Sequence, residues 1–112
     1  MTPPLEISPQ EVKRRLDSGE TLNLIDVREP HEFAQAKIEG ADLVPMRSVP
    51  GELQSLEARA EKAPLIVFCH HGMRSLNVVS WLREQGLENC QSMAGGIDAW
   101  SLAVDPSVPR YN

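Results

Sequence analysis

Short apolar runs alternate along the chain with segments of helical spacing. Five runs predict strands, at residues 5–7, 22–27, 41–45, 65–68 and 90–93. The run 65–68 (LIVF) is apolar throughout, which favours a central strand covered on both faces. The segments between them predict helices, at 9–18, 31–36, 50–62, 75–85 and 97–102. This alternation is typical of an α/β domain built on a mainly parallel sheet.

Local signals mark several of these boundaries. Ser8 is an N-cap candidate before Pro9, and Glu11 is placed to close a capping box. Gly86 is placed to end the helix 75–85. Residues 104–112 contain two prolines, and we expect an extended tail on the surface. The chain is therefore read as one domain, 1–112, with its core at about 5–103.

Composition and charge narrow the class of protein. The 112 residues are 41% hydrophobic and 24% charged, with a net charge of −5. This composition is globular, and the acidic balance argues against binding to nucleic acid. The apolar runs fall far short of the ~20 residues that cross a bilayer, and residues 1–8 lack the features of a signal peptide. We expect a soluble, cytoplasmic monomer with no nucleic-acid or membrane partner.

The two cysteines differ in their surroundings. Cys69 and Cys90 are too far apart for a C-x-x-C pair and too few for a zinc framework. A reducing compartment favours free thiols over a disulfide between them. Cys90 lies in a predicted strand without a glycine or basic neighbour, which favours a core or edge thiol.

Cys69 stands where a buried strand ends and a helix soon begins. In open α/β sheets ligands bind at this edge, next to helix N-termini. Gly72 permits a tight turn that aims N–H groups at the sulfur, and Arg74 with His70 or His71 adds positive potential. These features favour the thiolate and predict a nucleophile. The alternative is a core cysteine, but the polar run that follows it has no packing rationale.

Four segments resemble the rhodanese-type sulfurtransferase family. They occur in the family's order, at residues 24–33 (LIDVREPHEF), 38–41 (IEGA), 69–75 (CHHGMRS) and 95–100 (GGIDAW). One departure is Ala36-Lys37, where the family commonly has Gly-His before the isoleucine. The resemblance implies the rhodanese-like fold, with roughly five mainly parallel strands and helices on both faces.

The resemblance also implies a reaction. Cys69 would attack the outer sulfur of thiosulfate or another persulfide donor, sulfite would leave from thiosulfate, and a persulfide would remain on Cys69. Cyanide, a thiol or a sulfur-carrier protein would then accept the sulfur. No metal and no organic cofactor is implied. The persulfide would lie in a cradle formed by His70, His71, Gly72, Met73, Arg74 and Ser75.

Other polar residues have two interpretations each. Arg74 either binds an anionic donor, which we favour, or neutralises the helix start. Asp26 and Arg28 either bind substrate or brace the loop as an ion pair. Arg47 follows the third strand and is a weaker candidate for the pocket edge. Cys69, His70 and His71 do not predict a metal site, because adjacent residues rarely converge on one ion.

Two alternative functions remain open. Cysteine phosphatases and arsenate reductases also use a Cys-to-Arg anion loop. Those loops have one residue more than the four between Cys69 and Arg74, and the smaller ring favours a single sulfur over phosphate. The other alternative is a binding module or sulfur carrier, in which Cys69 holds sulfur for a partner protein.

Overall fold

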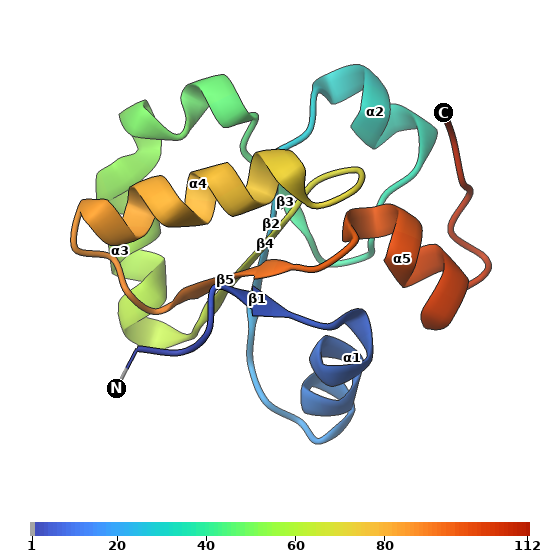
Figure 1. Cartoon of the computed structure of the whole chain (residues 1–112), viewed down its shortest axis with the longest axis horizontal. Helices are drawn as coiled ribbons and strands as arrows, with labels where there is room; N and C mark the ends of the chain where they lie inside the picture. The colour runs from blue at the N-terminus through green and yellow to red at the C-terminus, as the bar shows by residue number, and fades with distance from the viewer. Residues whose placement is uncertain (1) are drawn as a thin grey trace.

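The computed structural model describes residues 2–112 and contains one five-stranded sheet (Figure 1). The strands are β1 (Glu6–Ile7), β2 (Asn23–Asp26), β3 (Asp42–Leu43), β4 (Leu65–Phe68) and β5 (Cys90–Met93). Their order is β1-β5-β4-β2-β3, and every pair is parallel. All four residues of β4 are buried, so the predicted central strand is confirmed.

Helices cover both faces of the sheet, as predicted. They are α1 (Pro9–Asp17), α2 (Pro30–Gln35), α3 (Leu53–Lys62), α4 (Met73–Glu84) and α5 (Gly96–Ala103). Alternate side chains of β4 enter two separate cores, because successive residues of a strand face opposite sides. Leu65 and Val67 pack with residues of α3 and α4, whereas Ile66 and Phe68 pack with residues of α1 and α5.

Several helix boundaries differ from the sequence prediction. The segment expected as one helix, 50–62, begins with a 3-10 turn (Pro50–Glu52), after a similar turn at Met46–Ser48, and only α3 is α-helical. Ser8 caps α1 by accepting a hydrogen bond from the Glu11 N–H at 3.1 Å, as predicted. The capping box expected there is wrong, because the Glu11 carboxylate pairs with Arg14 instead.

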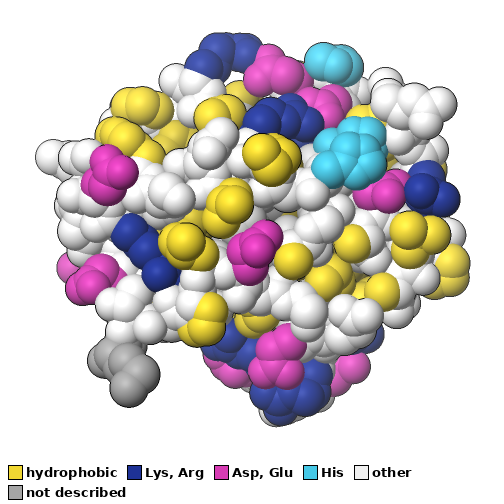
Figure 2. Space-filling view, in the orientation of Figure 1, with side chains coloured by type: hydrophobic (Ala, Val, Ile, Leu, Met, Phe, Trp, Pro, Cys, Tyr) yellow, Lys and Arg dark blue, Asp and Glu magenta, His cyan; other side chains and the backbone are white. Residues whose placement is uncertain are grey.

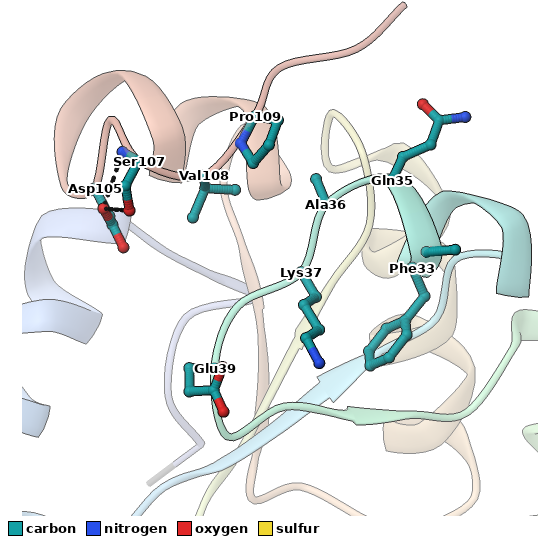
Figure 3. Close-up of a pocket in the computed structure, with 10 residues that line it drawn as sticks. Phe33, Gln35, Ala36, Lys37, Glu39, Asp105, Ser107, Val108 and Pro109 are labelled. Carbon is teal, nitrogen blue, oxygen red and sulfur yellow. Dashed lines mark hydrogen bonds between the residues drawn. The ribbon is translucent and has the colours of Figure 1, made fainter.

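The expectation of an extended surface tail at 104–112 holds only in part. Five of its residues are exposed, at 106, 107, 109, 110 and 112, but others pack on the domain. Ser107 N–H donates to the Asp105 carboxylate at 3.1 Å and turns the chain back toward the domain. Val108 is then buried in the core, and the Ser101 hydroxyl donates to its carbonyl at 2.7 Å. A cavity of about 540 Å³ lies between this tail and the end of α2 (Figure 3). The tail is therefore part of the fold.

None of the helices within residues 2–112 combines the length and apolar character that a membrane crossing requires. Cys69 and Cys90 are both free thiols, as expected, and both are buried. Burial raises the pKa of the Cys90 thiol, and Cys90 lies in the core at the start of β5. Of the core and edge positions expected for Cys90, the structure shows the core position.

Candidate active site

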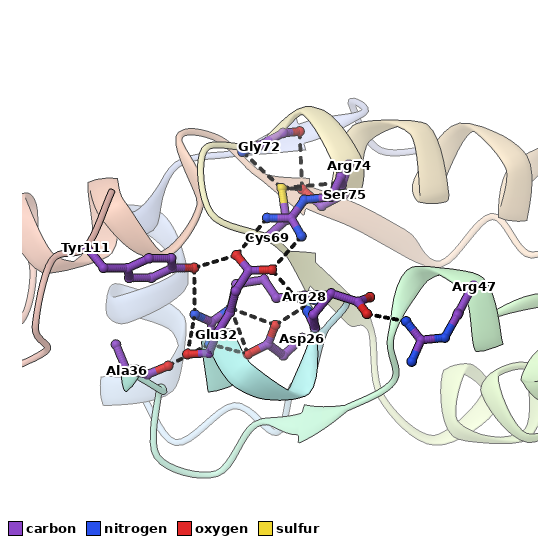
Figure 4. Close-up of polar contacts among 11 residues, drawn as sticks. Asp26, Arg28, Glu32, Ala36, Arg47, Cys69, Gly72, Arg74, Ser75 and Tyr111 are labelled. Carbon is purple, nitrogen blue, oxygen red and sulfur yellow. Dashed lines mark hydrogen bonds and ion pairs between the residues drawn. The ribbon is translucent and has the colours of Figure 1, made fainter. Parts of the chain in front are cut away.

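Cys69 lies directly after β4, at the carboxyl edge of the sheet, and its side chain is buried (Figure 4). Its Sγ accepts hydrogen bonds from the N–H groups of Gly72, at 3.1 Å, and Ser75, at 3.4 Å. Gly72 is the N-cap of α4 and has a φ of 106°, a conformation that glycine adopts without strain. The first turn of the helix therefore points N–H groups at the sulfur, an arrangement that stabilises a thiolate.

Two hydroxyl groups fix the helix start beneath the sulfur. The Ser75 hydroxyl donates to the Gly72 carbonyl at 3.2 Å and lies 2.7 Å from the Ser92 hydroxyl on β5. Both serines are fully buried. The sequence reasoning did not identify Ser92, because nothing near it marks it as a site residue. This contact fastens the cysteine loop to the neighbouring strand.

The N-terminus of α5 holds the other side of the loop. Ile97 N–H donates to the Cys69 carbonyl at 2.8 Å, and Asp98 N–H donates to the His70 carbonyl at 3.1 Å. Gly96 lies against the loop so closely that a Cβ on it would be 2.3 Å from the Cys69 carbonyl oxygen. The 95–100 segment therefore positions the cysteine loop through backbone contact.

Arg74 is paired within the protein rather than free. Its guanidinium donates to both oxygens of Glu32, at 2.7 and 2.9 Å. The hydrogen bonds from Arg74 hold the pKa of Glu32 well below its usual range, and Glu32 raises the pKa of Arg74. Sequence reasoning missed Glu32 as a site residue. Binding of an anionic donor by Arg74 stays a prediction.

Asp26 and Arg28 form a fully buried ion pair below this contact. Arg28 donates to the two Asp26 oxygens, with distances of 2.9 Å from Nε and 2.6 Å from a terminal nitrogen. Arg28 also donates to the carbonyls of Ala36, at 2.7 Å, and Glu32, at 3.3 Å. These contacts join the end of β2 to α2, and of the two interpretations they favour a brace.

Tyr111 links the C-terminal tail to the loop. Its hydroxyl donates to Glu32 at 2.8 Å and accepts from Arg28 at 2.9 Å (Figure 4). Its ring stacks on His70 at a centroid distance of 3.9 Å, and His71 stacks on His70 at the same distance. Burial raises the pKa of Tyr111 to about 12 and lowers the pKa of His70, which favours the neutral imidazole. Sequence reasoning missed Tyr111.

The remaining candidates lie apart from these contacts. Arg47 lies in the 3-10 turn after β3, and its exposed guanidinium pairs with Glu29 at the N-terminus of α2. Its place at the pocket edge stays a prediction. Within the part of the chain that the structure describes, no group of three or more His, Cys, Asp or Glu side chains is arranged to hold a metal ion.

Known proteins resemble this chain in sequence and in fold. The rhodanese-like domain family matches residues 8–103. Thiosulfate sulfurtransferase GlpE of Haemophilus influenzae is 39% identical over 106 residues, which cover 95% of this chain and 96% of that protein. The human single-domain sulfurtransferase TSTD1 has a similar structure, with a TM-score of 0.76 and 27% identity, over 90% of this chain and 98% of that one.

Larger proteins contain a similar segment. The adenylyltransferase and sulfurtransferase MOCS3-2 of Zea mays is 37% identical over 109 residues, which cover 94% of this chain but 23% of that protein. The chain thus spans about a quarter of the length of such relatives. The family that the sequence motifs resemble is confirmed, and with it the fold. The chain belongs to the rhodanese-like domain family.

Proposed function

We propose that the protein transfers a sulfane sulfur from thiosulfate, or from another persulfide donor, to a thiophilic acceptor through a persulfide on Cys69. One observation carries the proposal. The Cys69 sulfur lies at the start of α4 and accepts two backbone N–H hydrogen bonds. Membership of the family and the 39% identity with a thiosulfate sulfurtransferase support the same activity.

The reaction divides into two displacements. The Cys69 thiolate attacks the outer sulfur of thiosulfate, the sulfur–sulfur bond of the donor breaks, and sulfite leaves with the bonding electron pair. The product is a Cys69 persulfide whose outer sulfur carries the negative charge. An acceptor such as cyanide then attacks that sulfur, thiocyanate leaves, and the thiolate is restored. The N–H groups of Gly72 and Ser75 are fixed donors to the Cys69 sulfur, where they stabilise negative charge.

The structure gives reasons to prefer this reaction over phosphate chemistry. Only four residues separate Cys69 from Arg74, and the Arg74 guanidinium is engaged by Glu32. A phosphatase loop needs a wider ring of N–H donors and an arginine that faces the phosphate. A sulfur-carrier role, in which a partner protein loads Cys69, uses the same persulfide and differs only in the donor.

Mass spectrometry of the intact protein after incubation with thiosulfate tests the proposal. We expect a mass increase of one sulfur atom that a reducing thiol removes. Cys69→Ser should abolish the increase and the turnover of thiosulfate with cyanide, whereas the matched variant Cys90→Ser should retain both. Persulfide formation only from a partner protein would instead indicate a carrier. Normal turnover by Cys69→Ser, or hydrolysis of para-nitrophenyl phosphate at a comparable rate, would overturn the proposal.

A further inference from the structure

The Glu32 carboxylate is fixed from three directions. Arg74 donates to both of its oxygens, the Tyr111 hydroxyl donates to Oε2 at 2.8 Å, and the Glu29 N–H donates to Oε1 at 3.1 Å. Its side chain is only 10% exposed, whereas that of Arg74 is 36% exposed. Glu32 therefore cannot move away from Arg74 without breaking the capping box of α2 and the contact with the tail.

Charges around the cysteine loop cancel in pairs. Arg74 faces Glu32, Arg28 faces Asp26, and beside His71 the carboxylate of Asp98 pairs with Arg110. Burial lowers the pKa of His70, which favours its uncharged form. On the face drawn in Figure 2, acidic side chains likewise lie among the basic ones rather than leaving a patch of one sign. Beside these pairs, the N–H groups of Gly72 and Ser75 are two fixed donors that point at the sulfur.

We propose that Glu32 is a specificity-determining residue that neutralises Arg74 and so selects against doubly charged sulfur donors. The inference rests on the proposed sulfur transfer and refines its substrate class. A thiosulfate dianion must either displace a fixed carboxylate or bind beside a neutral ion pair. A donor with one negative charge instead of two, such as an organic persulfide or a thiosulfonate, meets less repulsion from Glu32. The site therefore favours singly charged donors over thiosulfate.

A purely structural role for Glu32 leads to a different expectation. Loss of a brace would change stability and would weaken binding of every ligand by a similar factor. Loss of the Glu32 charge would instead change the binding free energy of each ligand in proportion to the charge of that ligand. Comparison of two anions of similar shape, sulfate with two charges and methanesulfonate with one, separates the two roles. Neither anion carries a transferable sulfur, so binding is measured without turnover.

The experiment is an NMR titration of the Gly72 and Ser75 amides with each anion at low salt. In the unmodified protein we expect sulfate to bind no more tightly than methanesulfonate. Glu32→Gln should strengthen sulfate binding over methanesulfonate binding by roughly five-fold, the factor for one unit charge at about 4 Å in water. Glu29→Gln makes the same charge change at the N-cap of the same helix, beside Arg47, and should leave that ratio unchanged.

Three results would overturn the inference. The first is a clear preference for sulfate over methanesulfonate in the unmodified protein. The second is an equal change in the affinities for both anions in Glu32→Gln. The third is a change of the affinity ratio in Glu29→Gln as large as that in Glu32→Gln. The first result is measured on the unmodified protein, so this test can be made even if Glu32→Gln folds poorly. Adding Arg74→Gln to Glu32→Gln should remove the gain in sulfate binding, because Arg74 would be its source. Persistence of the gain would also refute the mechanism.

Turnover then distinguishes this inference from the proposed function. With thiosulfate and methanethiosulfonate as donors, Glu32→Gln should lower the KM for thiosulfate more than the KM for methanethiosulfonate. If neither donor forms a persulfide on Cys69 while the anion ratio shifts as expected, the proposed function fails and the role of Glu32 in charge selection stands. If persulfide forms but the anion ratio does not shift, the function stands and the inference fails.

Discussion

Gly96→Ala is a sharp test of how the cysteine loop is positioned. A Cβ at position 96 would lie 2.3 Å from the Cys69 carbonyl oxygen, 2.5 Å from that of His70 and 2.6 Å from the His70 carbonyl carbon. All three atoms belong to the backbone, so no side-chain rotation relieves the contact. The φ of Gly96 is also positive, at 62°. The substitution must therefore shift either the loop or the start of α5.

The expected loss of stability has two components. An alanine in the left-handed region costs about 1–2 kcal/mol. Overpacking against a rigid neighbour adds about 1–3 kcal/mol. The matched control is Gly40→Ala, where φ is 88° but no atom beyond the adjoining residues lies within 4 Å of the added Cβ. Gly40→Ala should lower the free energy of unfolding by the first component alone, so the difference between the variants, about 1–3 kcal/mol, measures the contact with the loop.

Urea denaturation of both variants gives the free energies of unfolding. Persulfide formation from thiosulfate gives the effect on the site, and it should slow in Gly96→Ala and stay unchanged in Gly40→Ala. The reason is that only position 96 bears on the backbone that carries Cys69. If Gly96→Ala unfolds no more readily than Gly40→Ala, the loop yields to the methyl group and the positioning argument is refuted.

Three further outcomes are expected. Tyr111→Phe keeps the ring that stacks on His70 but loses the hydroxyl between Arg28 and Glu32. It should lower the free energy of unfolding in urea by about 1–2 kcal/mol. No change would show that the hydroxyl contacts contribute no net stability. Arg74 lowers the pKa of Glu32 in the folded state, so the stability that Glu32 contributes should be complete above its ordinary pKa near 4.5 and lost as the pH falls below it. The difference in urea midpoint between the unmodified protein and Glu32→Gln should therefore shrink in acid, and a difference that is constant with pH would contradict the assignment. Burial raises the pKa of the Cys90 thiol, so iodoacetamide at neutral pH should label Cys90 only after unfolding, and peptide mapping that finds it labelled in the folded protein would contradict its core position.

Most of the fold follows from local patterns. The four apolar residues of β4 predict a strand buried on both sides, and Ser8 with Pro9 predicts the start of α1. The position of the tail does not follow from such patterns. Val108 is buried and Tyr111 is half-buried because they pack on residues distant in the chain. Two prolines near the end indicate an irregular segment, but they carry no information about what covers it.

The candidate site, like the fold, is predicted by local patterns only in part. Gly72 follows Cys69 and two histidines, and it predicts a turn that aims N–H groups at the sulfur. Sequence reasoning can find this turn because its signal lies within a few residues. The partner of Arg74 is Glu32, which precedes it by 42 positions, and no local pattern joins them. The capping box of α2, formed by Glu29 and Glu32, was a readable signal for a fixed acidic residue. It could not show which cation that residue meets.

The order of the strands explains why three separate motifs make one site. β2, β4 and β5 are consecutive neighbours in a parallel sheet, so their carboxyl ends lie at one edge. The segment after β2 carries Glu32, the segment after β4 carries Cys69, and the segment after β5 carries Gly96. Glu32 pairs with Arg74 of the loop, and Gly96 lies against the backbone of the loop. The geometry around the sulfur is therefore a property of the sheet edge, and residues 69–75 alone, placed before another helix, would lack the contacts that fix it.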